Sequence, residues 1–597
     1  MSQPSLSRYA LLGDGRTAAL VSDEGSIDWM CVPRFDSEPV FSRLVDPSGG
    51  CYSIRPLDVL RTDRSYLEDS ALLETRWQLR DTVVRMREGM VLDVSSKLLP
   101  QLMLVRHLSS EGQPAPLRVR FDPRRGLPSR APETSVRSGL INCRWRGLVL
   151  TLRASPGFGI VPGRESTVVL DPSEPMTFVL SVADREPTLD IESTVAVAAM
   201  NASLGWWRAW SQDLAYDGPV REAVVRSLVT LRLLTYPPSG APVAAPTTSL
   251  PERIGGSRNW DYRFAWPRDA SLGISSFLAV GKPDEAHLFM HWLLHASRLS
   301  RPRIDVLYTL DGRPGPPELE VAGVPGYRDS APVRTGNAAS HQHQLDVYGW
   351  VLDAALRLAR ARGGLHGETW RAMQSFADLV AGEWQRPDAG IWEIRGAPRH
   401  HVHSKVMAWV TLDRALALAA THRARRSRIA RWTGERDRIA SEVRGSGFDE
   451  TLHSYTRTYA SGDVDASLFH LITLGFDDAD RDRLRGTVSA VRSQLSAGGP
   501  LLYRYPPDSD ELEGSEGAFT ACSFWLIEAL STLGAIDEAD ELFADLCGRG
   551  SDLGLFAEEI EPSTGEQLGN MPQALTHSAL VQAAVSLAAA KVRRATA

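Results

Sequence analysis

The sequence predicts a multidomain β + α chain, in which an N-terminal antiparallel β-sandwich is followed by a C-terminal (α/α)6 barrel of paired helices. Three observations indicate this fold. The chain has 597 residues, too many for one ordinary hydrophobic core, so two or more domains are expected. Its hydrophobic pattern changes near residue 215 from alternation along short runs to the spacing of helices. Twelve helix-like segments follow that change, and six antiparallel pairs of helices can close into a barrel.

The first part, residues 1–191, has the pattern of antiparallel strands in a sandwich. Short runs alternate apolar and polar residues, and Gly, Pro, Asp and Ser separate them. The clearest runs are 17–21, 71–78, 83–86, 103–108, 117–121, 148–153 and 177–183. Residues 192–216 are predicted to form a helical linker. Its Trp206, Trp207 and Trp210 give an apolar stripe that we expect to dock onto a neighbouring element.

The second part, residues 217–597, has helical periodicity. We expect helices over 219–236, 267–280, 283–298, 342–362, 367–385, 403–421, 424–444, 464–474, 478–495, 516–533, 536–547 and 574–594. Long connections follow alternate helices, at 251–266, 300–340, 386–402, 498–515 and 551–573. Inner and outer helices alternate in such a barrel, so these connections are expected to gather at one end.

Composition and charge exclude several classes of protein. Hydrophobic residues make up 43% and charged residues 23%, as in a folded soluble protein. The net charge of −7 is modest and no basic stripe stands out, so we expect no nucleic-acid partner. The sequence shows no uninterrupted apolar stretch long enough for a bilayer and no secretory signal. We therefore expect no membrane partner and a cytoplasmic location.

Cysteine, histidine and tryptophan give hints about ligands. The five cysteines are odd in number and have no spacing typical of zinc sites, which fits a reducing compartment. His400, His401 and His403 lack a carboxylate partner at a suitable spacing, so we expect no metal and no cofactor. The 16 tryptophans suit either a sugar site, where an indole stacks on the apolar face of a pyranose, or a hydrophobic core.

Two glutamates in turn-like stretches are candidate catalytic residues. Glu393 lies in 390–396 and Glu558 in 555–560, each beside apolar and aromatic residues. Such surroundings disfavour the charged form of a carboxyl group. Glycoside hydrolysis requires two carboxyl groups in different surroundings, one to protonate the leaving oxygen and one to activate water or attack carbon. An isolated loop glutamate usually has no such role, so the rest of the chain must decide.

Other loop segments contain further candidates. Residues 258–270 combine Arg, Trp, Tyr and Asp just before a helix, as sites that bind sugars do. Arg268 and Asp269 fall at the start of that helix, where Asp269 is alternatively a helix cap. The remaining segments are 391–393, 502–506 with 516–519, and 556–559 with 565–570.

Together these segments resemble glycoside hydrolase family 15, which includes glucoamylases, glucodextranases and bacterial trehalases. The resemblance covers nearly the whole chain. Residues 9–21 and 25–29 look like the N-terminal sandwich of the bacterial trehalase-like branch, and 326–337, 344–349 and 403–409 match that branch as well. The resemblance implies the sandwich and barrel, a carbohydrate substrate and hydrolysis with inversion.

The resemblance also implies roles for single residues. Glu393 matches the general acid and Glu558 the general base, and Glu558 is preferred to Glu559 because it is the first acid of its motif. An inverting reaction places the two carboxyl groups roughly 6.5–9.5 Å apart, which leaves room for a water. The matching substrate-binding residues are Arg268 and Asp269, which bind the non-reducing glucose, Tyr262 near the catalytic water, Trp266 and Trp392 in the pocket wall, and Arg504.

The expected substrate is an α-glucoside, and trehalose is favoured because the motifs follow the trehalase-like branch. Ile394 stands where fungal glucoamylases have a second Glu that contacts the next sugar, which weakens the case for a starch-type substrate. A glucoamylase or an isomalto-type α-glucosidase remains open. A phosphorylase would use phosphate in place of the base, and the carboxylate of Glu558 argues against it. A non-catalytic sugar-binding protein is the alternative of a different class.

Overall fold

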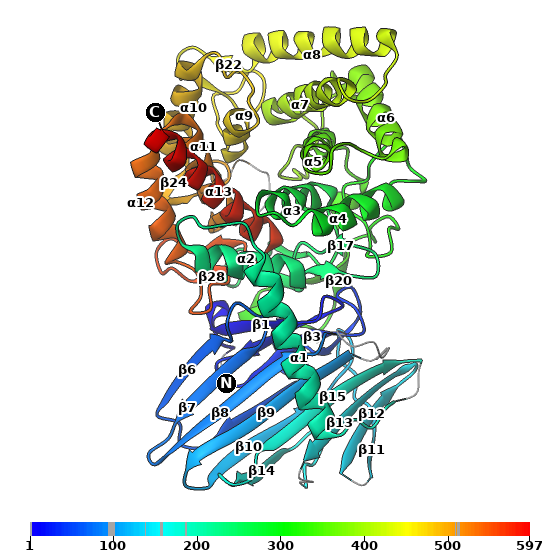
Figure 1. Ribbon diagram of the computed structural model, residues 1–597, viewed down its shortest axis with the longest axis vertical. Helices are drawn as coiled ribbons and strands as arrows, with labels where there is room; N and C mark the ends of the chain where they lie inside the picture. Colours follow the sequence, from blue (N-terminus) through cyan, green and yellow to red (C-terminus); the bar gives the residue numbers. More distant parts are fainter. Residues whose placement is uncertain are drawn as a thin grey trace.

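The computed structural model has two parts, a pair of β-sheets and a domain of paired helices, which a long helix joins (Figure 1). The sheets lie at the bottom of that view and the helices at the top. The described residues are 3–92, 102–137, 139–155, 159–185, 188–507, 509 and 514–596. Part of the predicted connection 498–515 lies outside them.

The N-terminal part is a sandwich of two antiparallel sheets around one hydrophobic core. One sheet has the strand order β1-β2-β3-β5-β10-β14 with β4 beside β3, and the other has the order β11-β12-β13-β15-β9-β8-β7-β6. Each of the seven predicted runs falls in one of these strands. The strands are β1 (Tyr9–Gly13), β2 (Ala18–Ser22), β3 (Ser26–Cys31), β4 (Pro39–Phe41), β5 (Cys51–Pro56), β6 (Arg61–Tyr66), β7 (Leu73–Gln78), β8 (Thr82–Met90), β9 (Leu102–Gly112), β10 (Ala115–Asp122), β11 (Glu133–Arg137), β12 (Leu140–Trp145), β13 (Leu148–Ser155), β14 (Glu165–Leu170) and β15 (Met176–Asp184).

Alternation along the strands explains why these residues form a sandwich. In β10, Leu117, Val119 and Phe121 are buried while Arg118 between them is exposed, as the two-residue period of a strand requires. Inside the sandwich Phe121 packs edge-on against Tyr52, with ring centroids 5.4 Å apart. The inward rows of both sheets therefore supply the core.

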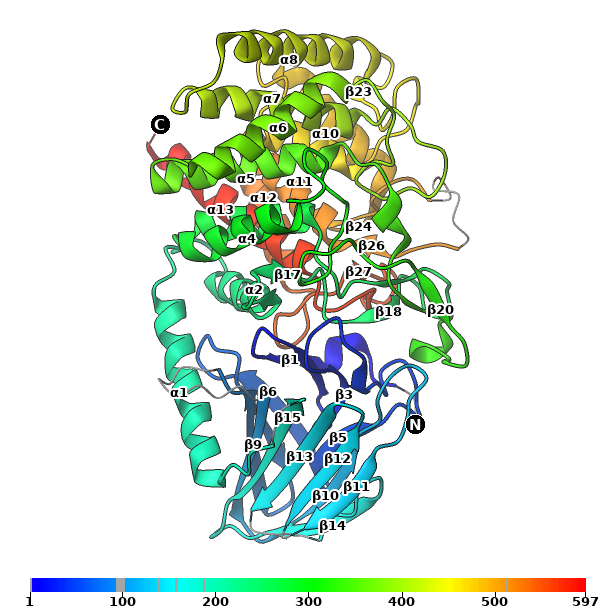
Figure 2. The same ribbon diagram turned by 90° about the vertical axis from the view of Figure 1, so that its right-hand side faces the viewer.

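Helix α1 (Ser193–Gln212) runs beside the sandwich and leads to the helical domain, as Figure 2 shows. Its Trp210 packs against Phe277 with ring centroids 6.4 Å apart, and its indole N–H donates to Glu285 at 2.6 Å. Both partners belong to the first helices of the barrel. The predicted docking of the tryptophan stripe is therefore confirmed.

Twelve helices of the described C-terminal part coincide with the twelve predicted segments. They are α2 (Arg221–Leu233), α3 (Pro267–Ala279), α4 (Pro283–Ala296), α5 (Asp346–Arg362), α6 (Gly367–Glu383), α7 (Val402–Ala419), α8 (Arg426–Ser446), α9 (Phe469–Thr473), α10 (Arg481–Leu495), α11 (Thr520–Leu533), α12 (Ile536–Cys547) and α13 (Ala574–Thr596). The odd-numbered helices from α3 to α13 contact one another in a closed ring, and the even-numbered helices pack outside it. This arrangement is an (α/α)6 barrel.

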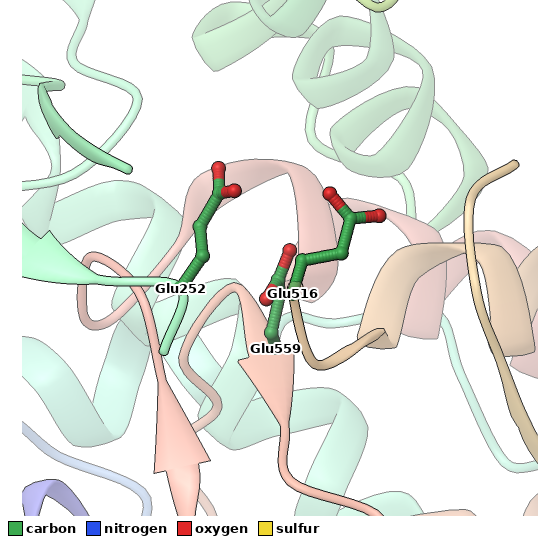
Figure 3. Close-up of side chains that lie close together, drawn as sticks. All are labelled: Glu252, Glu516 and Glu559. Carbon is green, nitrogen blue, oxygen red and sulfur yellow. The ribbon is translucent and has the colours of Figure 1, made fainter. Parts of the chain in front are cut away.

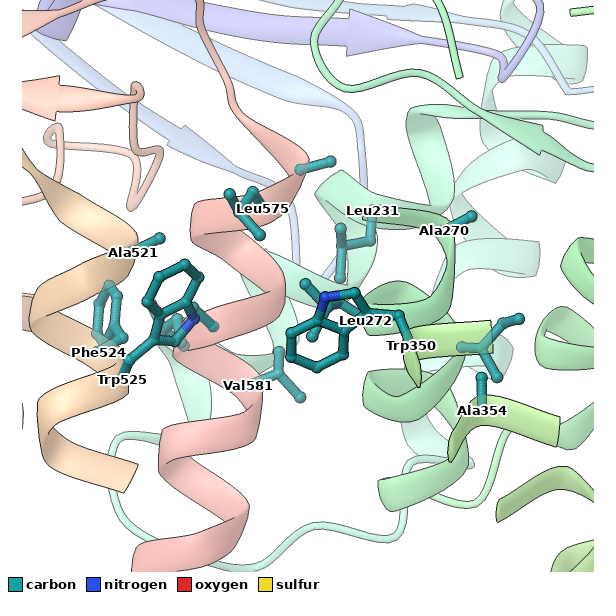
Figure 4. Packing of buried hydrophobic residues seen from close by; sticks show 14 of the residues in the cluster. Leu231, Ala270, Leu272, Trp350, Ala354, Ala521, Phe524, Trp525, Leu575 and Val581 are labelled. Carbon is teal, nitrogen blue, oxygen red and sulfur yellow. The ribbon is translucent and has the colours of Figure 1, made fainter. Parts of the chain in front are cut away.

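Apolar side chains of the inner helices fill the space between them (Figure 4). Leu272 of α3, Trp350 of α5, Trp525 of α11 and Val581 of α13 belong to one buried cluster. Burial of a large apolar side chain of this kind stabilises the fold by about 1.5–3 kcal/mol. The inner helices are therefore apolar on most of their surface, as helices packed on several sides are.

Helix α13 bears on the expectation that no uninterrupted apolar stretch is long enough for a bilayer, since it is long and apolar although His577 and Gln582 interrupt it. Among the described helices it alone is long and apolar enough by length and composition, and 61% of its apolar window is buried inside the protein. It contacts α2, α3, α11 and α12. Its apolar composition is therefore explained by its place in the inner ring.

The connections that precede the inner helices contain short antiparallel strands, which form two-stranded sheets and one three-stranded sheet, β26-β27-β28. These are β16 (Thr235–Tyr236), β17 (Ala241–Pro242), β18 (Thr248–Pro251), β19 (Asn259–Asp261), β20 (Leu319–Val321), β21 (Val333–Thr335), β22 (Phe448–Asp449), β23 (Ser454–Tyr455), β24 (Ser496–Gly498), β25 (Leu501–Leu502), β26 (Ala518–Phe519), β27 (Glu559–Ile560) and β28 (Gln567–Leu568). Four 3-10 turns accompany the strands: η1 (Leu6–Arg8), η2 (Tyr327–Asp329), η3 (Ala338–His341) and η4 (Ala466–Leu468). The N-terminal segment borders these connections, because the Tyr327 hydroxyl donates to the carbonyl oxygen of Pro4 at 2.7 Å.

A buried ion pair in the sandwich gives a stability prediction. Arg106 Nε lies 2.9 Å from Glu88 Oε2, and both side chains are 0% exposed. Glu88→Ala leaves the guanidinium buried without its counter-charge, so we expect a loss of about 3–5 kcal/mol in the free energy of unfolding, measured in urea.

The matched control is Glu165→Ala. Its carboxylate lies 3.0 Å from Arg118 Nε in the same sandwich, but both side chains are 54% exposed. We expect a loss of at most about 1 kcal/mol for this variant. Equal losses for both variants would contradict the prediction.

Candidate active site

All eight side chains that the sequence singles out line one pocket at the end of the barrel where the long connections meet. They are Tyr262, Trp266, Arg268, Asp269, Trp392, Glu393, Arg504 and Glu558. These residues come from four separate connections, so only closure of the barrel brings them together.

Glu393 stands on a tight turn between α6 and α7. Its φ is +57°, in the left-handed region that residues other than glycine rarely adopt. Its backbone N–H donates to the carbonyl oxygen of Gly390 at 3.2 Å, and the Gln342 side chain donates to the carbonyl oxygen of Glu393 at 3.0 Å. The surrounding contacts thus hold a strained backbone conformation, which is typical of functional sites.

The carboxylate of Glu393 accepts two hydrogen bonds on Oε1. Trp266 Nε1 donates at 2.9 Å and Arg268 Nη2 at 3.2 Å. The Glu393 side chain is 21% exposed, whereas Glu558 is 1% exposed. Apolar surroundings therefore do not single out Glu393 as the acid, because Glu558 is the more buried of the two.

Arg268 and Asp269 lie in the first turn of α3. Trp266 is the residue at the N-cap and Pro267 follows it, so Asp269 is not the helix cap. Arg268 Nη1 donates to the carbonyl oxygen of Ile391 at 2.8 Å, which ties this helix to the turn of Glu393. Arg268 Nε and Asp269 Oδ2 form an ion pair at 3.4 Å, and neither atom makes a hydrogen bond within the described residues. The two charges are thus paired with each other in the pocket lining.

Glu558 precedes α13 and is oriented by one hydrogen bond. The Tyr262 hydroxyl donates to Glu558 Oε1 at 2.7 Å. Glu558 Oε2 accepts no hydrogen bond within the described part of the chain. Gly569 makes room for it: a β-carbon there would lie 2.6 Å from Oε2, and the glycine has a φ of +74°. One carboxylate oxygen is thus fixed by Tyr262, while the other is buried against Gly569.

The surroundings of Glu558 favour its protonated form. Burial raises the pKa of Glu558, and the negative charge of Glu252 raises it further, whereas Arg504 and the Tyr262 hydroxyl lower it. Burial and the charge of Glu558 also raise the pKa of Tyr262, which stays a donor. The charges around Glu558 therefore help to set the pH range in which its carboxyl group is ionised.

Glu559 does not line the pocket. Its side chain is 0% exposed, and its Oε2 accepts the backbone N–H of Gly517 at 2.8 Å. Its backbone pairs with Phe519 in the small sheet of β26 and β27. The geometry therefore supports Glu558, and not its neighbour, as the carboxyl group that reaches a ligand.

Aromatic side chains form the pocket wall and are themselves fixed. Trp392 donates its indole N–H to Asp465 Oδ2 at 2.9 Å, and its ring lies 5.5 Å from that of Phe519. Trp266 packs edge-on against Tyr262 at 5.8 Å between centroids. Fixed aromatic faces beside charged groups are what a pyranose ring needs for binding.

Arg504 is held by two glutamates that the sequence did not mark as functional. Its Nη2 donates to Glu516 Oε2 at 2.6 Å and to Glu252 Oε2 at 3.1 Å. Glu516 lies in a segment already noted for its chemistry, and Glu252 lies at the start of the connection before α3. Their positions in or near the predicted loop segments were the only sign of a role in the sequence. An ion pair between distant segments leaves no repeating pattern of residues that a sequence could show.

Trp260 and Arg395 also line the pocket without having been predicted. The Arg395 guanidinium lies 4.2 Å from the centre of the Trp260 ring and its Nη2 is 2.7 Å from Glu318 Oε2. Ile394 lies beside them in the lining. Arg395 is 35% exposed and Arg268 is 11% exposed, so Arg395 marks the outer part of the pocket and Arg268 the inner part.

Two groups of residues, a run of histidines and a group of three glutamates, have side chains of the types that bind metal ions. The ring of His400 stacks on Tyr459 at 5.7 Å, whereas the ring of His403 lies in the barrel interior, 5.5 Å from that of His470, so the neighbouring histidines have different surroundings. The carboxylates of Glu252, Glu516 and Glu559 offer oxygens within 4.8 Å of one another among the described residues (Figure 3). Arg504 contacts two of these carboxylates and supplies positive charge there.

Comparison with known proteins identifies relatives over the full chain. A family model described as "Glycosyl hydrolases family 15" matches residues 218–585, and one described as "Trehalase-like, N-terminal" matches residues 1–130. The chain is 32% identical to a trehalase of Thermoplasma volcanium, over 99% of this chain and 95% of that relative. It is 34% identical to a trehalase of Mycolicibacterium smegmatis, over 98% of this chain and 91% of that relative.

A solved structure shows the same fold. A bacterial glucoamylase complexed with acarbose superposes with a TM-score of 0.70 at 13% sequence identity. The match covers 100% of this chain and 97% of that one. Sandwich and barrel therefore occur together in a protein of distant sequence.

The raised pKa of Glu558 predicts a pH-dependent loss of stability. Between the ordinary pKa of 4.5 and the raised value, the folded protein keeps a proton that the unfolded chain has released, so stability falls as the pH rises. Glutamine cannot ionise, so we expect Glu558→Gln to flatten this fall by up to about 1.4 kcal/mol per pH unit. Urea unfolding between about pH 5 and pH 8 measures the slope.

Glu383→Gln is the control, because this carboxylate is partly exposed and pairs with Arg303 on the surface. It is expected to keep the wild-type slope. If the slope of Glu558→Gln equals that of the wild type, Glu558 does not titrate in this range.

Proposed function

This chain belongs to glycosyl hydrolases family 15 and is a glycoside hydrolase, and we propose that it is an α,α-trehalase that works with inversion of configuration. The observation that supports this most directly is similarity to trehalases over both the sandwich and the barrel. The pocket adds two glutamates, a sugar-binding pair of opposite charge and an aromatic wall.

One glucose of the substrate would occupy the inner part of the pocket. Arg268 and Asp269 line this part, and charged groups make the stronger hydrogen bonds to hydroxyls. Trp266 and Trp392 offer apolar faces beside them. These contacts hold the ring so that its anomeric carbon lies between the two glutamates.

Glu393 would act as the general acid. It donates a proton to the glycosidic oxygen, and the bond from that oxygen to the anomeric carbon breaks. Arg268 Nη2 donates to Glu393 at 3.2 Å. Glucose hydroxyls would compete for that guanidinium and leave Trp266 as the remaining partner of the acid.

Glu558 would act as the general base. Its carboxylate takes a proton from water while the water oxygen bonds to the anomeric carbon from the opposite face. Tyr262 holds Oε1 of Glu558 at 2.7 Å, which orients the carboxylate for this step. The attacked glucose is released as the β-anomer.

The outer part of the pocket supports a disaccharide as substrate. The residue after the acid is Ile394, which offers no charge to a second sugar. Trp260 and Arg395 form the wall beyond it, and Glu318 anchors Arg395 there. Rates of hydrolysis of different α-glucosides distinguish a trehalase from a glucoamylase or an isomalto-type glucosidase.

Hydrolysis of trehalose, maltose, isomaltose and starch, with and without phosphate, tests the proposal. Cleavage of one bond in trehalose frees two glucose molecules, of which only the attacked one can invert. We expect trehalose to be the best substrate and ¹H NMR to show equal initial amounts of α- and β-glucose. Initial α-glucose alone would show retention, and faster cleavage of maltose or isomaltose would replace trehalase by the alternative.

The same assay tests the two glutamates. We expect Glu393→Gln and Glu558→Gln each to lower kcat by about 10²–10⁴-fold, because each removes a proton donor or acceptor. Circular dichroism should show that both variants fold. Full turnover by either variant would contradict the role assigned to that glutamate. If the wild type binds the sugar but hydrolyses none, the result would favour a sugar-binding protein.

Gly569 gives a test that leaves both glutamates in place. The methyl group of Gly569→Ala would lie 2.6 Å from Glu558 Oε2, so we expect it to displace the base and lower kcat by about 10²-fold or more. Gly565→Ala is the matched control. Gly565 has the same φ of +74° in the same connection, but nothing lies within 4 Å of an added β-carbon. Equal kcat values for the two variants would show that the contact with Glu558 does not matter.

A further inference from the structure

Four carboxyl groups and two guanidinium groups lie together at the pocket wall: Glu558 and Arg504 line the pocket, and the others are Glu252, Glu516, Glu559 and Arg258. Glu252 and Glu516 contact Arg504, and Arg258 Nη1 lies 2.9 Å from Glu516 Oε2. Figure 3 shows Glu252, Glu516 and Glu559 converging from three separate segments. Glu558 and Glu559 make no ion pair with either guanidinium group among the contacts described. The group therefore contains more negative than positive residues.

Glu252 is the member of this group that contacts two parts of the pocket wall. Its side chain is 1% exposed. Its Oε1 accepts the indole N–H of Trp260 at 2.9 Å, and its Oε2 accepts Arg504 Nη2 at 3.1 Å. Both of these partners line the pocket, whereas Glu252 itself does not. One carboxylate thus fixes an aromatic ring and a cation that face the ligand.

The backbone places Glu252 close to Glu558. The N–H of Gly569, the glycine packed against Glu558, donates to the carbonyl oxygen of Pro251 at 2.8 Å. The N–H of Gly517 donates to the carbonyl oxygen of Glu252 at 3.2 Å and lies beside Glu559. The backbone at Pro251 and Glu252, where β18 ends, is therefore hydrogen-bonded to the segments that contain Gly569 and Gly517.

On the premise of the proposed function, we propose that Glu252 is a positioning residue for hydrolysis: it fixes Arg504 and Trp260 in the wall and places a negative charge behind the base Glu558. The charged and titratable groups that face Glu558 and Glu252 here are Tyr262, Arg258, Arg504, Glu516 and Glu559. The negative charge of Glu252 raises the pKa of Glu558, and Arg504 lowers it, in agreement with this geometry.

A cation site is the competing explanation for three converging carboxylates, because hard cations bind carboxylate oxygens. Both oxygens of Glu252 accept donors from the protein, namely Trp260 and Arg504, and Glu516 Oε2 accepts Arg258 and Arg504. Glu559 Oε2 accepts the N–H of Gly517, so Glu559 Oε1 is the one oxygen of the three carboxylates that lacks a donor among the described residues. Two fixed guanidinium charges also repel a cation. The group is therefore better explained as an ion-pair network that supports the pocket.

The test is the pH dependence of kcat/KM for trehalose, measured on the full-length protein. Glu252→Gln removes the charge and leaves a single acceptor oxygen for Trp260 and Arg504. The acidic limb of the profile of kcat/KM against pH reports the pKa of the base, and we expect this limb to shift to lower pH by roughly one unit in the variant. We also expect the KM of the variant to rise by about tenfold. Trp260→Phe removes the hydrogen bond without a change of charge, so its KM should rise while the limb stays in place.

A charge change of opposite sign keeps the test decisive if Glu252→Gln fails to fold. Arg258→Gln removes a positive charge from the same network without touching the pocket lining, so its acidic limb should shift to higher pH. Limbs that stay at the wild-type pH in every variant that folds would overturn the inference and indicate a purely structural role.

Two further outcomes are informative. Loss of wild-type activity in EDTA that Mg²⁺ or Ca²⁺ restores would overturn the inference in favour of a cation site. No hydrolysis of trehalose by the wild type would refute the proposed function. In that event, the same profiles are measured on whichever α-glucoside is cleaved, and the expected shifts are unchanged.

Discussion

Contact between the first and last helices of the inner ring is the constraint on which the site depends. Helices α3 and α13 are neighbours although almost the whole barrel lies between them in the sequence. Two hydrogen bonds cross this junction: Ser276 Oγ donates to the carbonyl oxygen of Ser578 at 3.3 Å, and Gln582 Nε2 donates to that of Leu272 at 3.2 Å. The junction sets Arg268 at the start of α3 near Glu558 in the segment before α13. Without closure the two halves of the pocket would not face one another.

Most of the fold was predictable because its elements have a period. Apolar inner helices and alternating strands each repeat a local pattern that burial enforces, so twelve helices and seven strands appear where the sequence indicates them. Helix α13 shows where apolar composition misleads: a helix packed on several sides is apolar enough to resemble a membrane span. Such a helix can be distinguished only by its packing partners, which a single sequence does not show.

The pocket residues were predictable through motifs, but their supporting contacts were not. Glu252 pairs with Arg504 across 252 positions of sequence, and neither residue type nor spacing indicates that pairing. The relative burial of the two glutamates is a similar case. Both have apolar neighbours in the chain, yet Glu558 is the more buried and Glu393 contacts Arg268. Exposure and charge around a carboxylate are set by segments distant in sequence, so local composition cannot assign acid and base.

Burial of so many ionisable groups beside one pocket lowers the stability of the fold. Each buried charge loses hydration, and a buried ion pair seldom recovers the whole loss. A hydrophobic replacement of the same volume would stabilise the fold at least as well, so stability alone does not explain the network. Its members instead hold two wall residues, Arg504 and Trp260, from behind, where solvent cannot compete for their hydrogen bonds. A wall held in this way needs little reorganisation when a sugar binds, which is the condition under which fixed dipoles and charges contribute most to catalysis.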